Sequence, residues 1–501
     1  MIAHIFRKDW HLIGKPALAV ACIQFAYTAI QIRQTLLGGT PVLQQLGQVL
    51  IWLWLMAGTI LIIAIVQQDA LPGTRQDWLT RPIPRRSVLI EKVLFITAMV
   101  QGPAIGGDLL QGCVYGFPFR QTAAAALARA VVLFVAMLIP ALLLGAVTES
   151  VTQAMVLAVV AIFGVFAFTM VAIGTAGGYG HQFDPTGLTG EEWLPNTARF
   201  VLFLLGAAII LAVQYRTRNT LRARLHVAAL LLLLLVSQLT PWKPVFAMQQ
   251  KLSPEPGASR SIALAWRPGA VPLEPAPKGR FALPLLVTGL PADSILKADK
   301  SEVTISDRSG RVLYSGPGGD LQIAGTNRLP NETSFNHTLA LPAGSGGLLR
   351  GREIQAHALY SLTLFKLGEA FSLQAVGDNQ RLPGWGWCRT RANEDDTAIE
   401  VSCVQMGKGP TCATVFLENP ASGKRNPENT SCSPNYAPYS DRPIPDAVAR
   451  FRLVLPFHDR SGLIQYPLEA SQLGGARVVI RMFVPQDHFA RELTSPLMKP
   501  S

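Results

Sequence analysis

The chain has 501 residues and a formal net charge of +12, yet only 15% of its residues are charged and its mean hydropathy is +0.29. This composition excludes a protein that is soluble throughout, and the length allows more than one domain. Nearly all long apolar runs come before Thr240, so the sequence divides near Trp242 into a membrane half and a water-facing half. Arginines of the first half lie beside apolar runs and those of the second half are mixed with acids, which argues against nucleic-acid binding.

Residues 1–15 combine apolar positions at helical spacing with basic residues on the other side. The apolar positions are Ile2, Ile5, Phe6, Trp10 and Ile13, and the basic side carries Arg7, Lys8 and His11. This pattern predicts an amphipathic helix that lies in the cytoplasmic interface of a membrane. The alternative is that these residues extend the first spanning helix into the headgroups, and the sequence leaves both open.

Residues 16–240 are expected to form an α-helical membrane bundle of about seven spans, because a span needs about 20 mostly apolar residues. The candidate spans are residues 16–32, 48–66, 93–110, 126–147, 151–174, 200–214 and 225–239. The last two are short, and they could form one hairpin that does not cross the membrane fully.

The distribution of basic residues predicts the orientation of this bundle. With a cytoplasmic N-terminus, the cytoplasmic segments carry Arg7, Lys8, Lys15, Arg75, Arg81, Arg85, Arg86, Lys92, Arg216, Arg218, Arg222 and Arg224. The opposite side receives only Arg33, Arg120, Arg129 and Arg199. We therefore expect an integral protein of the cell (plasma or inner) membrane whose residues after 240 lie outside the cytoplasm.

The stretch "DWLTRPIPRRSVLIEK", residues 77–92, separates the second and third candidate spans. Pro82 and Pro84 prevent a continuous helix between those spans, because proline lacks the backbone N–H and clashes with the preceding turn. Trp78 and Leu79 give the stretch an apolar side, and its basic residues are Arg81, Arg85 and Arg86. A short, rigid, basic elbow of this kind suits docking to a partner protein or to anionic lipid.

Residues 241–501 predict an all-β, sandwich-like region, because short alternating runs are bounded by turn residues. The candidate strands are residues 260–266, 281–289, 302–307, 360–365, 371–376, 397–405, 449–457 and 476–484. One or two modules fit this length, with a boundary near residue 350.

Four cysteines of the second half form an even set outside the cytoplasm, which is typical of disulfides. They are Cys388, Cys403, Cys412 and Cys432. Sequential pairing, Cys388 with Cys403 and Cys412 with Cys432, is favoured because each bridge closes a short loop. A zinc site is the weaker alternative, since no pair has CxxC spacing and no histidine lies among them.

Motifs for catalysis are absent from the sequence: there is no GxxxxGK[ST], HExxH or GxSxG. We therefore predict no catalytic, cofactor-binding or metal-binding residues, and we expect ATP hydrolysis, if any, in a partner. Polar residues within spans are often functional, and the candidates are Asp108, Arg129, Glu149, Gln24 and Gln101. The three charged residues lie near predicted span ends, where each can reach water or headgroups.

The elbow resembles the loop between the second and third spans in permease subunits of type-2 ABC transporters. The residues that follow the family's pattern are Trp78, Leu79, Thr80, Pro82, Ile83, Arg85, Leu89, Ile90 and Lys92, and "FRKDW" at residues 6–10 is also similar. The resemblance covers roughly the first 240 residues. It implies that the ATPase subunit contacts Ile5, Phe6, Trp10 and the coupling residues Trp78, Leu79, Arg81, Pro82, Ile83, Arg85 and Arg86.

This resemblance implies a permease that works with a cytoplasmic ATP-binding subunit and with a second permease or another copy of itself. The chain departs from the family, whose members usually have six spans and no large exported domain. A second hypothesis is a membrane-anchored sensor or binding protein whose exported β region recognises a ligand or an envelope partner. A polytopic membrane enzyme is the third and least supported class.

Overall fold

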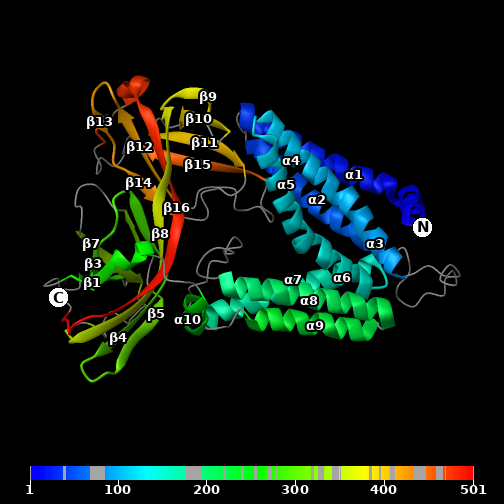
Figure 1. Cartoon of the computed structure of the whole chain (residues 1–501), viewed down its shortest axis with the longest axis horizontal. Coiled ribbons are helices and arrows are strands. Elements are labelled where there is room, and N and C mark those ends of the chain that lie inside the picture. Colours follow the sequence, from blue (N-terminus) through cyan, green and yellow to red (C-terminus); the bar gives the residue numbers. More distant parts are fainter. Residues whose placement is uncertain are drawn as a thin grey trace.

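The structure is a computed structural model of the chain with an α-helical region followed by a β region (Figure 1). The N-terminus lies at the end of the helical region that is far from the β region. The description covers residues 2–37, 41–67, 85–175, 193–217, 220–237, 242–252, 257–267, 273–276, 280–317, 321–324, 332–340, 349, 351–382, 386–393, 397–406, 412–432, 447–457, 466–468 and 470–499.

Each predicted span overlaps one helical segment in the described part of the chain. These segments are α1 (Ile2–Leu37), α2 (Pro41–Gln67), α3 (Arg85–Ile96) continued by η2 (Thr97–Gln101) and α4 (Gly102–Val114), α5 (Phe119–Leu133) continued by η3 (Phe134–Leu138) and α6 (Ile139–Val147), α7 (Val151–Thr175), α8 (Trp193–Thr217) and α9 (Thr220–Val236). A further short helix, α10 (Trp242–Leu252), leads into the β region.

Five helical segments of the described chain are long and apolar enough to cross a membrane: Phe6–Leu36, Pro41–Gln67, Ile90–Val114, Phe119–Val147 and Leu194–Gln214. Val151–Ala167 is a shorter apolar helix. The helical membrane region is therefore confirmed in outline, whereas the count of seven crossings stays a prediction.

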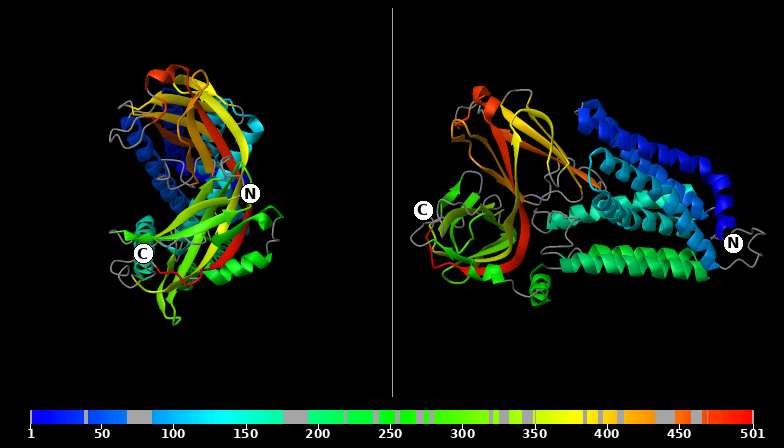
Figure 2. Two further views of the ribbon diagram at one scale, coloured as in Figure 1. Left: turned by 90° about the vertical axis from the view of Figure 1, so that its left-hand side faces the viewer. Right: turned by 45° about the horizontal axis from the view of Figure 1, so that its top comes forward.

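One continuous helix, α1, covers both the predicted interface helix and the first predicted span. Pro16 lies inside this helix and removes one backbone hydrogen bond there. Figure 2 shows the first turns of α1 running at an angle to the rest of the helix. The N-terminal residues thus extend the helix of the first predicted span, as one alternative expected. They also turn away from its direction, as the interface-helix alternative expected.

Small residues set the spacing of the helices that form the bundle core. A Cβ atom at Gly107 of α4 would lie 2.5 Å from the hydroxyl oxygen of Thr28 on α1. A Cβ atom at Gly112 would overlap the side chain of Thr122 on α5 in the same way. Glycine lets backbones approach closely where the hydrophobic effect cannot drive association, so α1, α4 and α5 pack as one unit.

The described strands of the β region form three antiparallel sheets. The β3 sheet has the order β1-β3-β2 with β7 also on β3, the central sheet has the order β13-β12-β16-β8-β4-β5 with β14 on β12 and β6 on β4, and the β11 sheet has the order β15-β11-β10-β9. The strands are β1 (Ala263–Trp266), β2 (Leu273–Ala276), β3 (Arg280–Thr288), β4 (Ser294–Asp307), β5 (Val312–Pro317), β6 (Leu321–Ala324), β7 (Glu332–Ala340), β8 (Ile354–Gln374), β9 (Gly377–Arg381), β10 (Trp387–Ala392), β11 (Ala398–Met406), β12 (Cys412–Asn419), β13 (Lys424–Arg425), β14 (Asn429–Ser431), β15 (Val448–Pro456) and β16 (Arg477–Thr494).

In the described part of the chain, two large hydrophobic cores lie along the central sheet, with a smaller cluster around Phe365 and Phe483, and the long strands β8 and β16 belong to both large cores. Leu285, Leu362 and Phe489 are in the first core, between the β3 sheet and the central sheet. Leu373 and Ile480 are in the second core, which the β11 sheet covers. Strands β8 and β16 pass from one core to the other, so the two cores share these strands, and the boundary near residue 350 stays a prediction.

The predicted strands 360–365 and 371–376 are parts of the single strand β8, so the turn expected between them is wrong. Gly368 lies in that stretch, where the pairing of β8 with β16 shifts register between Met482 and Phe483. A β-bulge accommodates the glycine without ending the strand. A second register shift, between Pro485 and Asp487, likewise lets β16 continue past the proline.

Two disulfides join the cysteines of the β region in the sequential pairs that the sequence favours. Cys388 and Cys403 lie directly opposite each other on β10 and β11, with their Cα atoms 4.1 Å apart. Cys412 and Cys432 pair with a Cα separation of 4.0 Å. Disulfides are typical of oxidising compartments, which supports a location outside the cytoplasm for this region.

Candidate functional site: the two junctions of the helix bundle

A buried ion pair joins α1 to α3 at the N-terminal end of the bundle. The ammonium nitrogen of Lys92 lies 2.5 Å from a carboxylate oxygen of Asp9, and the two side chains are 1% and 0% exposed. Removing two charges from water costs several kcal/mol per ion, and only close pairing offsets that cost. The pair therefore fixes the first turns of α1 against α3.

An aromatic contact lies beside this ion pair. The rings of Phe6 and Phe95 have centroids 4.9 Å apart and are tilted by 59°, which is a favourable arrangement for two aromatic rings. On α1 the contacts run from Phe6 to Asp9, whereas their partners on α3 run backward from Phe95 to Lys92. The first turns of α1 thus run across α3 in the opposite sense. We call these four residues the N-terminal junction.

The residues predicted to couple to an ATPase lie next to this junction in the sequence. Trp78, Leu79, Arg81, Pro82 and Ile83 fall outside the described residues. Arg85 and Arg86 are the first two residues of α3, although the structure does not describe their side chains, and the same holds for Ile5 within α1. Trp10 is 44% exposed, so part of its ring is available at the surface.

A second buried ion pair lies deeper in the bundle, between α4 and α5. Arg129 donates to Asp108 across 2.5 Å, and the side chains are 3% and 2% exposed. Gln101 donates from its amide to the backbone oxygen of Ala130, 3.2 Å away. We expected Asp108 and Arg129 to reach water at span ends, but the structure pairs them with each other inside the protein.

Two π-helical segments interrupt the rods that contain these polar residues. Gly102 donates its N–H to the oxygen of Thr97 in η2, and Ile139 donates to the oxygen of Phe134 in η3, which are i to i−5 bonds. A proline directly follows each donor, Pro103 and Pro140. Proline crowds the carbonyl of the preceding turn, and a widened turn removes that clash. Such π-bulges often occur at functional positions.

The two π segments meet at one glycine of α2. A Cβ atom at Gly58 would overlap the terminal methyl of Met137 in η3 and lie 3.6 Å from Val100 in η2. Three helical rods therefore make contact at a place where two of them have irregular backbones. Bulges of this kind are places where helices kink.

The turn between α4 and α5, residues 115–118, forms the junction at the other end of the bundle. Tyr115 is fully buried, and its hydroxyl donates to the hydroxyl of Thr35 (2.9 Å) and lies 3.3 Å from the backbone oxygen of Gln31, which ties the turn to α1. Gly116 has a φ of +71°, a backbone conformation that favours glycine. We call this turn, with its contacts on the β11 sheet, the β-side junction.

The turn packs into the β11 sheet, which lies beside the outer ends of α1, α4 and α5 (Figure 1). Phe117 and Tyr115 form one apolar cluster with Val404, Met406 and Val448, and Ile32, Leu36, Ala125 and Trp387 pack around it. Arg381 of β9 also donates to the backbone oxygen of Gly116. The β region is therefore anchored to the helices through side chains from both sides, and not only through the chain that connects them.

Polar side chains lie on the face of the central sheet that points away from the first core. Thr363 bonds to the carboxylate of Asp299 and lies 2.7 Å from the Nδ1 of His488. Burial raises the pKa of Asp299 above its usual value, although Lys297 lies 3.7 Å away. Burial also lowers the pKa of His488, against the opposing effect of the nearby Asp299 and Asp487 carboxylates. Asp299, Thr363 and His488 come from three strands of the central sheet, β4, β8 and β16.

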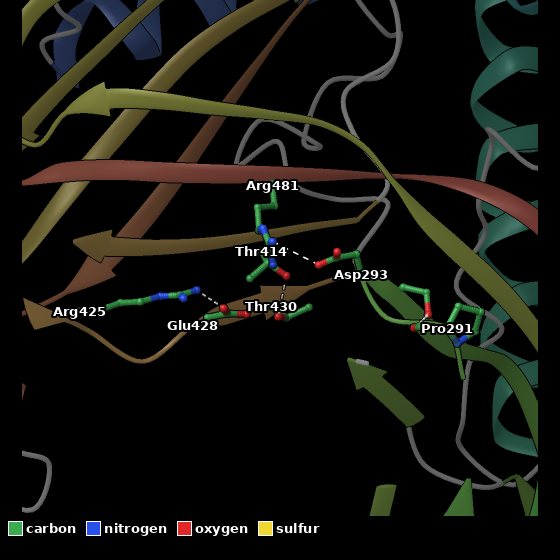
Figure 3. Close-up of polar contacts among 8 residues, drawn as sticks. Pro291, Asp293, Thr414, Arg425, Glu428, Thr430 and Arg481 are labelled. Atoms are coloured by element: carbon green, nitrogen blue, oxygen red, sulfur yellow. Dashed lines mark hydrogen bonds and ion pairs between the residues drawn. The ribbon is translucent and has the colours of Figure 1, made fainter. Parts of the chain in front are cut away.

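A different set of polar contacts lies on the part of the central sheet formed by β12, β13, β14 and β16, and one of them reaches Asp293 before β4. Figure 3 shows Arg481 of β16 directed toward Asp293, with a separation of 3.2 Å, and Thr414 bonded to Thr430 across 2.8 Å. Arg425 pairs with Glu428 in the same view. Because these charges are partly exposed, each pair contributes little to stability, and this surface does not indicate a binding site.

The described residues contain no group of three or more His, Cys, Asp or Glu side chains arranged to hold a metal ion. The residues that sequence analysis missed are Asp9 and Glu91, both fully buried, and the partnership of Lys92 with Asp9. The available signal was the single acid Asp9 among the basic residues of the first turns of α1, and the adjacent charges Glu91 and Lys92 in α3. Spacing along the chain could not reveal it, because the partners are 83 residues apart.

Comparison of the chain with models of known protein families gives no matching family. Comparison with curated proteins likewise gives no significant relative. Function is therefore argued from the geometry of the two junctions and of the bundle between them.

Proposed function

We propose that this chain is the membrane permease subunit of an ATP-driven transporter, coupled through residues 77–92 to a separate cytoplasmic ATPase. The single observation that carries the proposal is the buried ion pair of Asp9 and Lys92. It joins the two stretches that resemble type-2 ABC permeases, since Asp9 lies in "FRKDW" and Lys92 ends the elbow motif. A partner that contacts one of these stretches would then also act on the other stretch, through the ion pair.

The rod made of α3, η2 and α4 supports transmission along the bundle. From Lys92 to Tyr115 it contains 23 residue steps, which corresponds to about 35 Å at the rise of an α-helix. Its beginning belongs to the N-terminal junction, and its end leads into the turn that packs on the β11 sheet. A partner that displaces the elbow would therefore move this rod and, through its far end, the turn that packs on the β11 sheet.

The π segments supply the place where the rods would bend. Both lie between the two junctions, and both contact Gly58 of α2. In the proposed cycle, binding energy from ATP and its subunit selects between two arrangements of the bundle. The chain then contributes a two-state bundle rather than catalytic groups.

Orientation follows from the same proposal. The elbow side faces the cytoplasm, where an ATPase would bind, and the β region lies outside. The excess of basic residues on the elbow side and the two disulfides of the β region support this assignment. The exported region would receive cargo from the bundle or hand it to an envelope partner.

Purification in mild detergent tests the proposal. We expect a subunit with a GxxxxGK[ST] motif to co-purify with the chain, as identified by mass spectrometry, together with ATP hydrolysis. Replacing Arg81, Arg85 and Arg86 by alanine should release that subunit, whereas replacing the exposed Lys424 and Arg425 of the β region should not. Absence of such a subunit, or its retention by the triple variant, would reject the proposal.

A sensor is the second candidate function, and the β-side junction favours it. Ligand binding to the exported region could move the turn at residues 115–118 and so transmit a signal inward along the same rod. The sensor hypothesis predicts that the full chain binds a ligand at its β region and that the elbow tolerates substitution. Loss of a co-purified ATPase in the arginine variant separates the two functions.

A further inference from the structure

The short helix α10 is the least explained element of the helical region. It comprises residues Trp242–Leu252 and lies between the last helix of the bundle and the first strand. Figure 1 looks nearly along its axis, whereas α8 and α9 lie lengthwise in the same view, so α10 lies crosswise to both. It is found at the end of these helices that is near the β region.

The sides of α10 differ in chemistry. Gln249 is 5% exposed and the helix contacts α8. Pro244, Met248 and Leu252 follow one another at intervals of four residues and therefore line one side of the helix. Met248 and Leu252 are each 57% exposed. Lys251, at the border of this apolar stripe, is exposed in the last turn.

Water is a poor surrounding for such a helix. Helices of about this length are marginal on their own in water, so tertiary or membrane contacts must hold them. Among the α10 side chains that the structure describes, Gln249 is buried whereas Met248 and Leu252 are exposed, and this exposed stripe gains nothing from solvent. An apolar phase beside the stripe would provide the missing contact, because each buried CH₂ group contributes about 0.8 kcal/mol.

The position of α10 indicates that the apolar phase beside its stripe is the membrane. The exposed apolar residues Leu232, Leu233 and Val236 extend to the end of α9. Six residue steps separate Val236 from Trp242, which span at most about 21 Å. Figure 1 shows α10 beside the ends of α8 and α9 that are near the β region, so it lies near the level at which the exposed apolar surface of α9 ends, and we take that level as the boundary between acyl chains and headgroups.

We infer that α10 binds the lipid interface on the β-region side of the membrane. Met248 and Leu252 insert among the upper acyl chains, and the ammonium group of Lys251 reaches the phosphate groups of the lipids, as long basic side chains do at such boundaries. This lipid contact holds the start of the β region against the membrane. It is independent of whether the chain transports a substrate.

Fluorescent labelling of single cysteines tests the inference on the full chain. The exposed thiols Cys22 and Cys113 are first replaced by alanine, while the four disulfide-bonded cysteines remain unreactive. The variants Met248→Cys, Leu252→Cys and Ala247→Cys are each labelled with an environment-sensitive dye and placed in vesicles of phosphatidylcholine and phosphatidylglycerol. Ala247 is the matched control, because it is exposed but lies about 100° around the helix from Met248.

We expect blue-shifted emission at positions 248 and 252, with several-fold stronger quenching by nitroxide lipids than by aqueous iodide. Position 247 should show the reverse preference. Quenching at both 248 and 252 by iodide, with no response to nitroxide lipids, would overturn the inference. A response at one of the two positions is sufficient for support, so a variant that fails to fold does not remove the test.

Discussion

The carboxylate of Asp9 and the ammonium group of Lys92 meet at 2.5 Å between α1 and α3, and neither side chain reaches solvent. The rings of Phe6 and Phe95 pack beside them. Apolar residues could fill the same space at a lower desolvation cost. The pair therefore indicates a requirement for one specific arrangement of the two helices, which fits a position where force enters the bundle.

Replacing Lys92 by methionine should destabilise the chain by about 3–5 kcal/mol, because it leaves the charge of Asp9 buried without its partner. The double variant Asp9→Leu with Lys92→Met should recover most of that loss. Thermal unfolding in detergent measures both, and Lys251→Met serves as the exposed control. A double variant no more stable than Lys92→Met would show that the pair does not act as a unit.

Replacing Phe117 by alanine should loosen the attachment of the β region to the helices. Phe117 is 9% exposed and packs against Val404 and Met406, and loss of a buried phenylalanine costs about 3–5 kcal/mol at a well-packed site. Hydrogen exchange of β11 and β15 should accelerate. Phe119→Ala is the matched control, since Phe119 is 69% exposed. Equal exchange rates in the two variants would argue against the β-side junction.

Acidification should destabilise the β region through His488. Part of the ring reaches the surface, yet burial lowers its folded-state pKa below the usual 6.5. The unfolded chain therefore binds the proton first, and stability present above about pH 6.5 is lost as the pH falls. The nearby Asp299 and Asp487 carboxylates act on the pKa of His488 in the opposite direction, and burial raises the pKa of each carboxylate. Protonation of these carboxylates favours the folded state as the pH falls, which is opposite in sign to the effect of His488.

The variant His488→Gln should remove part of this pH dependence. Thermal unfolding of the full chain between about pH 7.5 and pH 5.5 measures the effect, within the range where histidine titrates. The melting temperature of the wild type should fall more steeply with decreasing pH than that of the variant. Parallel curves would show that His488 does not contribute.

Replacing Pro103 and Pro140 by alanine should stiffen the bundle. Without the prolines, η2 and η3 can close into regular α-helix, so thermal stability should stay constant or rise by up to about 3 kcal/mol. ATP turnover of the proposed complex should fall, because the rods lose their hinge. Pro244→Ala, in the first turn of α10, provides a control at a position where proline disturbs no helix. Unchanged turnover in the double variant would exclude the hinge.

Sequence reasoning located the helices well because each span must be about 20 apolar residues long. It could not find η2 and η3, since a widened turn leaves the hydrophobic pattern nearly unchanged. It also missed α10, which is too short for a clear pattern. The interface-helix pattern of residues 1–15 described one side of α1 correctly but not the continuity of the helix.

The β region shows a different limit. Predicted strands such as 397–405 and 449–457 correspond closely to β11 and β15. Short strands without clear alternation, such as β10 and β12, were missed, although their cysteines were paired as expected. The division of the region into modules could not be predicted, because the cores are joined by strands whose bulges look like turns in the sequence.

The candidate site was predicted in part. Phe6 and Trp10 were named, and the structure gives Phe6 a role in the N-terminal junction. Asp108 and Arg129 were named separately, while their pairing depends on two helices being close in space. The coupling residues from Trp78 to Ile83 lie outside the described residues, so their role rests on the resemblance and on Lys92.

Site-specific photocrosslinking at Arg81 in native membranes tests the central claim most directly. A photoreactive residue at this position should form a covalent product with a subunit that carries a GxxxxGK[ST] motif, and the same residue at the exposed, apolar-helix position Leu127 should not. The account predicts this product at Arg81 alone. A product at both positions, or none with any such subunit at Arg81, would contradict it.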